Sequence, residues 1–312
     1  MFGRVLAVAL NTYRESVRAR ILLGLAGVAF AVALYSLVVG AFTLKNAPRV
    51  VSDLGAASIS IFSLAVAIII GATSLHRELE QKTVFPILAR PIRRGEYLVG
   101  KYLGTLITIA VFIMADAGLV MLLEAAIARD ASPLVVRTSA GLAFGLATAL
   151  ALAAWKIPAA RTYGPIPWAA AMLVAGALLA SPDERRVVLG SGALTLLEIG
   201  IVAGFATLFS SFSTPFLSAL MTLGVFLVGR SADSLAKLPP KMFGEAAHQA
   251  GLALSKVVPN LQIFVPPRPL LVGEVVDVKL ASYLGMATLT SIGWSVGLLA
   301  VAVLVFNERD FL

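Results

Sequence analysis

The chain has 312 residues, of which 59% are hydrophobic and 13% charged, and its mean hydropathy is +0.93. Soluble domains contain about 45–50% apolar and about 25% charged residues, so this composition excludes an ordinary soluble enzyme and predicts a multi-pass membrane protein. The net charge of +8 comes without the aromatic pattern of a base-stacking surface, so we expect contact with membrane lipids and no binding of nucleic acid.

Residues 1–20 begin the chain with an amphipathic pattern. Polar and basic side chains from Arg4 to Arg18 recur on one helical face, and apolar side chains such as Tyr13 fall mostly on the other. A basic face opposite an apolar face is typical of a helix that lies in the membrane interface. We therefore expect an interfacial elbow helix before the first span; the alternative is a plain cytoplasmic tail.

Eight apolar runs follow, and we expect each to cross the bilayer or nearly to do so. Two of them lie within residues 138–181, on either side of a linker bracketed by Trp155 and Trp168, and this pattern predicts an inserted helical hairpin. The chain then has eight spans, or six if the hairpin does not cross. The predicted spans are residues 21–42, 55–75, 102–126, 138–155, 166–181, 190–210, 215–228 and 282–306.

Either even number of spans places both termini on one side of the membrane. With the termini inside, the cytoplasmic segments carry 13 Lys and Arg residues, the short outer loops carry six, and residues 230–281 carry six. This asymmetry predicts cytoplasmic termini in a cell (inner) membrane and makes 230–281 an extracytoplasmic loop. Within it we expect an interfacial helix at 241–256 and an extended or turned VPPRPL segment at 265–270.

No motif for chemistry on this chain survives inspection. Gly95, Gly100 and Lys101 match the spacing of a phosphate-binding loop, but Tyr102 replaces the required Ser or Thr and a membrane helix follows, so we reject the match. The two histidines lie in different loops and cysteine is absent, which predicts no metal site. We expect no catalytic residue and no cofactor bound by this chain.

Three acidic residues fall inside predicted spans: Asp116 and Glu124 in the third, and Glu198 in the 190–210 span. Ionisable residues within a membrane span are functional candidates, and Asp116 and Glu124 lie eight residues apart, roughly on one helical face. They could line a polar path for cargo or protons. The alternative is that each is protonated or hydrogen-bonded to a neighbouring helix and only stabilises packing.

The sequence HRELEQKTVFPILARPIRRGEYLVGKYLG, residues 76–104, is a charged island between two apolar runs. Two prolines keep a short helix around residues 83–88 separate from both spans. Its exposed apolar side chains are costly in water unless something covers them, so this segment either docks on a partner or folds back on the membrane surface.

Three short motifs lie in the island: E-x-E-x-K-T from residue 78, L-x-x-P-x-x-R from residue 88 and Y-x-x-G-K from residue 97. Together they resemble the coupling-helix region of ABC-2 type transporter permeases. The amphipathic N-terminus and the long loop before the last span also resemble that family. The resemblance implies that a coupling loop at 76–101 contacts a separate ATPase subunit through Glu78, Glu80, Thr83, Val84, Phe85, Ile87, Leu88, Arg90 and Arg94.

The resemblance further implies an all-α polytopic permease that pairs with a second copy, identical or similar, and with two ATPase subunits that bind ATP and Mg²⁺. The chain would then supply the translocation path of an exporter and not hydrolysis. Residues 138–181 depart from the six-span core of the family. Two alternatives remain from the sequence: a proton-coupled secondary carrier that uses Asp116 or Glu198, and a membrane scaffold that transports nothing.

Overall fold

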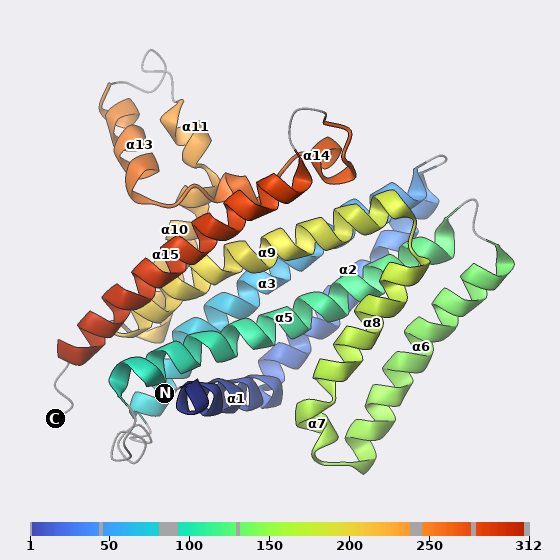
Figure 1. Cartoon of the computed structure of the whole chain (residues 1–312), viewed down its shortest axis with the longest axis horizontal. Coiled ribbons are helices and arrows are strands. Elements are labelled where there is room, and N and C mark those ends of the chain that lie inside the picture. The colour runs from blue at the N-terminus through green and yellow to red at the C-terminus, as the bar shows by residue number, and fades with distance from the viewer. Residues whose placement is uncertain are drawn as a thin grey trace.

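The protein is a bundle of long helices, most of which run side by side (Figure 1). No strand occurs in the residues that the computed structural model describes, which are 2–43, 46–80, 93–128, 132–237, 245–275 and 279–308. The prediction of an all-α polytopic membrane bundle is confirmed. In chain order the helices are α1 (Phe2–Arg18), α2 (Arg20–Ala41), α3 (Ala47–Glu80), α5 (Arg94–Ile127), α6 (Pro133–Lys156), α7 (Ala160–Tyr163), α8 (Pro165–Leu179), α9 (Pro182–Ser210), α10 (Pro215–Arg230), α11 (Ala232–Ala236), α13 (Glu245–Val257), the 3₁₀ helix η1 (Leu261–Phe264), α14 (Arg268–Val272) and α15 (Leu280–Glu308).

The amphipathic N-terminal pattern forms α1, which lies across the first turns of α5 (Figure 1). The two helices approach closely because α5 has glycines at the contact. A Cβ atom at Gly104 would lie 2.4 Å from the carbonyl oxygen of Ala9 and 2.6 Å from Cβ of Thr12, and one at Gly100 would lie 2.6 Å from Cβ of Val8. The position of α1 against the bundle therefore depends on these two small residues.

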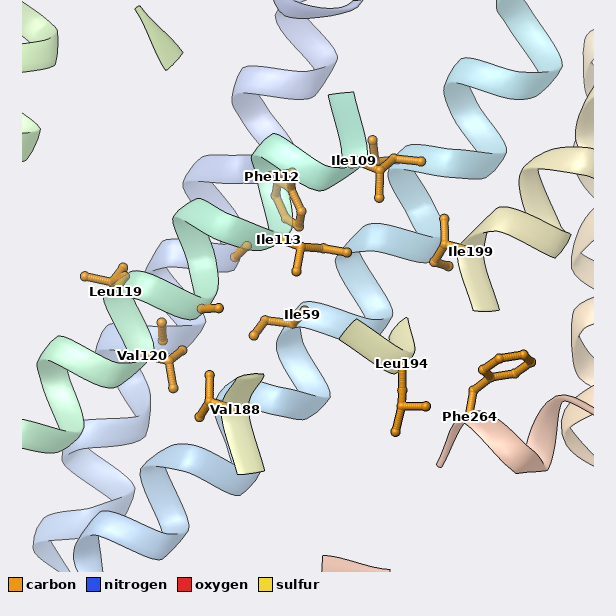
Figure 2. Packing of buried hydrophobic residues seen from close by; sticks show 14 of the residues in the cluster. Ile59, Ile109, Phe112, Ile113, Leu119, Val120, Val188, Leu194, Ile199 and Phe264 are labelled. Atoms are coloured by element: carbon orange, nitrogen blue, oxygen red, sulfur yellow. The ribbon is translucent and has the colours of Figure 1, made fainter. Parts of the chain in front are cut away.

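The core lies between α3, α5 and α9, which cross the middle of the bundle, with α2 and α15 on its flanks. Figure 2 shows Ile59 of α3, Val120 of α5 and Val188 of α9 among the side chains that meet there. Small residues bring the backbones together, since a Cβ atom at Gly55 would lie 2.4 Å from Cγ1 of Val120. This close packing of small residues is how helices associate within lipid.

Six of the described helices are long and apolar enough to cross a membrane, but they are not the six that the sequence suggested. Both limbs of the hairpin were expected to cross the membrane together or not at all. In the structure α6 is long enough to cross, whereas α8, with 15 residues, is not. The predicted span at 215–228 also becomes a short helix, α10, of 16 residues. At 1.5 Å per residue these two helices cover about 22–24 Å, less than the ~30 Å hydrocarbon core.

The hairpin packs on the bundle through α8 rather than α6. A Cβ atom at Gly118 of α5 would lie 2.4 Å from the backbone of Met172, so α5 and α8 are in backbone contact. In contrast, the apolar length of α6 is almost entirely unburied in the bundle. The indole Nε1 of Trp168 donates a hydrogen bond to the Leu146 carbonyl, 2.8 Å away, and links the two limbs. Trp155 is mostly exposed beside their connection.

The segment after α10 packs back on the bundle through η1, and the helix expected at 241–256 lies at α13. Leu261 and Phe264 of η1 are buried, and Figure 2 shows the Phe264 ring beside Leu194 of α9. The helices α11 and α13 pack chiefly on each other and project beyond α15 (Figure 1). The expectation of an extended or turned chain is wrong for residues 268–270, which begin α14. A proline in the first helical turn is tolerated because its missing N–H has no partner there.

We name the two ends of the bundle for what meets at each. At the junction end, α3 ends, α5 and α1 begin and α15 ends; at the far end, α3 and α9 begin and α5 ends (Figure 1). The first and last helices of the chain therefore meet the same end of the bundle, as an even number of crossings requires.

Candidate functional site at the junction end

The predicted coupling loop joins two long helices at the junction end. Glu78 and Glu80 lie in the last turn of α3, and Arg94 begins α5. The predicted contact residues between them lie outside the described residues: Thr83, Val84, Phe85, Ile87, Leu88 and Arg90. The described part of the site therefore consists of the end of α3, the start of α5 and the helices that contact them.

Arg94 connects the start of α5 to the end of α15. Its Nη1 donates hydrogen bonds to the carbonyl oxygens of Asn307, at 3.0 Å, and Phe306, at 3.5 Å. The last carbonyls of a helix have no intrahelical partner and carry partial negative charge, which favours a cation there. One turn further along α5, the ring of Tyr97 stacks on the ring of Phe306, with centroids 6.4 Å apart.

Glu96 connects the same turn of α5 to α1. Its side chain is only 5% exposed, and Oε2 accepts a hydrogen bond of 3.1 Å from the Arg93 backbone N–H in a capping box. The same oxygen lies 3.7 Å from Nη1 of Arg4. One carboxylate thus caps α5 and holds the N-terminal helix against it.

Lys101 connects α5 to the end of α3. The residue is 4% exposed, and its Nζ donates hydrogen bonds to the backbone oxygen of Ser74, at 3.0 Å, and to its Oγ, at 2.8 Å. Nζ also lies 5.6 Å from the centroid of the Tyr97 ring. The sequence interpretation placed Lys101 in the rejected phosphate-loop match and in the Y-x-x-G-K motif, but predicted no bonding partner for it. The sequence did contain a signal for this contact, namely a lysine near the start of an apolar helix. A buried ammonium requires hydrogen-bond acceptors, which a neighbouring helix can supply.

Of the three intramembrane acids, Glu124 is engaged at the far end. It is fully buried, and its two carboxylate oxygens accept hydrogen bonds from Ser181, one from the backbone N–H at 3.2 Å and one from Oγ at 2.8 Å. Ser181 is the N-cap residue of α9. Glu124 therefore binds the end of α5 to the start of α9.

Glu198 forms a bidentate ion pair with Arg230, the last residue of α10. The distances are 2.5 Å from Nε to Oε1 and 2.7 Å from Nη2 to Oε2. The same Nη2 donates to Oγ of Ser60 at 3.1 Å, so this pair joins α9, α10 and α3. Such a paired carboxylate has the geometry of a packing element.

Asp116 differs from both. It is fully buried, and neither of its carboxyl oxygens has a hydrogen-bond partner among the described residues. Asp116 and Glu124 are separated by eight residues of α5, about 12 Å along the helix, and Glu124 has its own partner. The structure thus gives the three acids three different surroundings, and the polar path through them stays a prediction.

An ionic network at the far end was absent from the sequence interpretation. Arg268 of α14 donates from Nη2 to Glu184 of α9 at 2.5 Å and from Nη1 to Asp53 of α3, and Ser52 hydrogen-bonds Glu184. Burial alone would lower the Arg268 pKa, but hydrogen bonds and charges from Glu184 and Asp53 outweigh it and raise that pKa. No local pattern could reveal this network, since the bonded residues lie 84 to 215 positions apart in sequence.

Comparison with protein families adds an independent observation. Residues 14–162 match the model described as ABC-2 family transporter protein, just under half of the chain, and the match spans the whole 76–101 segment and the helices on either side of it. No curated protein matched the chain. Permeases of this family are membrane components of transporters that work with ATPase subunits. The matched segment, the helical bundle and the motifs at residues 78–101 agree: residues 14–162 are similar to an ABC-2 family transporter protein.

Proposed function

We propose that this permease is the membrane subunit of an ABC exporter and that residues 76–101 dock on a separate ATPase subunit. The observation that carries the proposal is the position of that segment between two long helices. It connects α3 and α5, which have 34 residues each and pack on each other through the core. A force applied at residues 81–92 therefore acts on the two helices that extend through the middle of the bundle.

The proposed cycle follows from this arrangement. Closure of the ATP-bound ATPase subunits pushes on residues 83–88, and α3 and α5 tilt with the segment between them. The contacts of Arg94 with α15 and of Glu96 with α1 extend the movement to both flanks. Two permease copies then open and close a path between them, while ATP and Mg²⁺ are bound by the partner and this chain hydrolyses nothing. The basic loops support cytoplasmic termini in the inner membrane.

Co-purification with an ATPase tests the proposal. The variant Phe85→Asp should abolish ATPase association or ATP hydrolysis by the complex while the chain still inserts in the membrane. The matched control is Phe42→Asp, an equally drastic change at a residue that is 85% exposed just after α2, away from the junction end. Wild-type hydrolysis and association in Phe85→Asp, or equal loss in both variants, would contradict docking at this segment.

A second candidate function rests on Asp116 alone. An unpartnered carboxyl group in the interior of a membrane bundle could carry a proton, which would make the protein a proton-coupled carrier. Transport by Asp116→Asn with an unchanged dependence on the proton gradient would exclude this role. Glu198 is less suited to it, because its carboxylate is held by Arg230.

A further inference from the structure

We propose that Lys101 is a positioning residue that makes α3 and α5 move as one unit when the coupling segment is pushed. The inference rests on the proposed function, because it specifies how movement at residues 81–92 enters the membrane. It gives a role to a residue that neither the predicted ATPase contact nor the intramembrane acids explain.

The location of the bond is the first argument. Residues 81–92 connect α3 to α5 along the chain. Lys101 connects the same two helices directly: its ammonium, two turns into α5, donates to Ser74, which lies about two turns before the end of α3. A cross-link at this position prevents a push on the segment from merely spreading the two helices apart.

The chemistry of the bond is the second argument. A lysine that is 4% exposed among apolar helices is retained only where its charge is well solvated by protein groups. Here a backbone carbonyl and a hydroxyl of one residue accept from Nζ, and the face of Tyr97 lies within cation–π distance. Separating the helices would leave the ammonium without these acceptors, so the bond resists separation more strongly than apolar contact would.

The neighbourhood of the bond is the third argument. The same Tyr97 ring that lies under the Lys101 ammonium stacks on Phe306 at the end of α15. The bond therefore lies inside a connected set of contacts and not at a frayed helix end. A merely structural lysine would stabilise the fold; a positioning lysine must also change how nucleotide-driven movement is transmitted.

Spin-label distances in the intact complex with its ATPase subunits separate these two roles. The chain contains no cysteine, so pairs can be introduced directly. One pair, Thr73→Cys with Leu103→Cys, uses exposed positions on α3 and α5 beside the bond; a second, Phe42→Cys with Leu189→Cys, uses exposed positions towards the far end. Both are measured by pulsed electron paramagnetic resonance without nucleotide and with ATP and vanadate, together with ATP hydrolysis.

In the otherwise wild-type complex the junction pair should keep one narrow distance while the far-end pair shifts with nucleotide. In Lys101→Met the distribution of distances between the junction labels should become about twofold wider. The fraction of molecules whose far-end distance shifts with nucleotide should fall about threefold, with ATP hydrolysis retained. Lys101→Arg should restore most of the shift. Ser74→Ala leaves the carbonyl acceptor, so alone it should have a smaller effect than Lys101→Met. Combined with Lys101→Met, it should cause no further change.

The outcomes are distinguishable. Unchanged junction and far-end distances in Lys101→Met, or additive effects of Lys101→Met and Ser74→Ala, overturn the role of Lys101 while the proposed function stands. A far-end pair that never responds to nucleotide, in a chain that binds no ATPase, overturns the proposed function itself. Thr108→Val serves as control, because among the described residues that buried hydroxyl bonds the Gly104 carbonyl of its own helix alone, and its loss should leave both distances unchanged.

Discussion

The two ends of the bundle are held together by different interactions. At the junction end, α1 contacts α5 at two glycines, Lys101 and Arg94 donate to the oxygens of Ser74 and Asn307, and Arg4, with a half-exposed side chain, pairs with Glu96 at 3.7 Å. At the far end, α3, α9 and α14 are joined by the ion pairs of Arg268 with Asp53 and Glu184. Steric and neutral contacts are insensitive to salt, whereas exposed ion pairs are screened by it.

This difference suggests a division of roles. Under the proposed function the junction end would receive the push and would have to be stiff, and close backbone packing supplies stiffness without depending on solvent conditions. The far end would then have to open and close, which requires contacts that can be exchanged with water at small cost, and partly exposed ion pairs allow this. Arg268 remains charged throughout: its raised pKa means that its stabilising contribution is lost only as the pH rises through a value far above neutrality.

The largest expected effect is steric disruption of the junction end. Gly104→Leu forces a side chain against the Ala9 carbonyl and Thr12, so α1 cannot dock. We expect the free energy of unfolding to fall by about 3 kcal/mol, or the protein to fail to fold. Gly27→Leu is the control, because nothing lies within 4 Å of an added Cβ there. Thermal unfolding in detergent measures both, and equal stability of the two variants would contradict the tight packing.

The next effect is at the far end. Arg268→Ala leaves Glu184, 12% exposed, without its ionic partner, and we expect a loss of about 2 kcal/mol, below the ~3–5 for fully buried pairs because Arg268 is partly solvated. Arg49→Ala is the matched control: it removes an arginine 3.6 Å from the same Asp53, but both side chains are about half exposed, and a change within about 0.5 kcal/mol is expected.

A smaller effect is expected at the contact of α5 with α9. Ser181→Ala removes the Oγ donor to Glu124 but keeps the backbone donor, so we expect a loss of about 1 kcal/mol. Ser139→Ala removes a buried hydroxyl that bonds only the Val136 carbonyl of its own helix and should cost less. If the two substitutions lower the unfolding temperature equally, the contact between the helices contributes nothing specific.

Salt should give the smallest effect and the most direct test of the comparison. Between about 0.1 and 1 M salt the Debye length falls from about 10 to about 3 Å. The destabilisation by Arg268→Ala should therefore shrink by a few tenths of a kcal/mol. The destabilisation by Gly104→Leu should change less, because it is mainly steric and the Arg4–Glu96 pair that it also breaks is long and half exposed. An equal salt dependence of the two destabilisations would show that the two ends are held alike.

Much of the fold followed from the sequence because the bilayer imposes simple rules. The amphipathic helix at the N-terminus, the long apolar helices and the hairpin near 138–181 each have a local pattern of hydropathy. The local pattern did not predict whether a short apolar helix is long enough to cross the membrane. The run at 215–228 becomes the short α10, which ends with Arg230 at the buried Glu198, a contact between residues 32 positions apart.

The candidate site divides in the same way. The motifs at residues 78–101 identified the family, because they are contiguous and their spacing is readable. The bonds that mount this segment could not be predicted, since Lys101 finds Ser74, and Arg94 finds the end of α15, only after the helices have packed.

By itself, then, the sequence determined that this protein is a helical membrane protein with a charged segment between two long helices. Hydrophobicity and spacing are local properties, and they suffice for that conclusion. Only the tertiary structure decided that Glu124 and Glu198 have partners, that Asp116 has no hydrogen-bond partner among the described residues, and that Lys101 joins α3 to α5. Whether a buried charge is satisfied depends on groups that other helices bring to it, and that pairing is fixed by packing and not by distance along the chain.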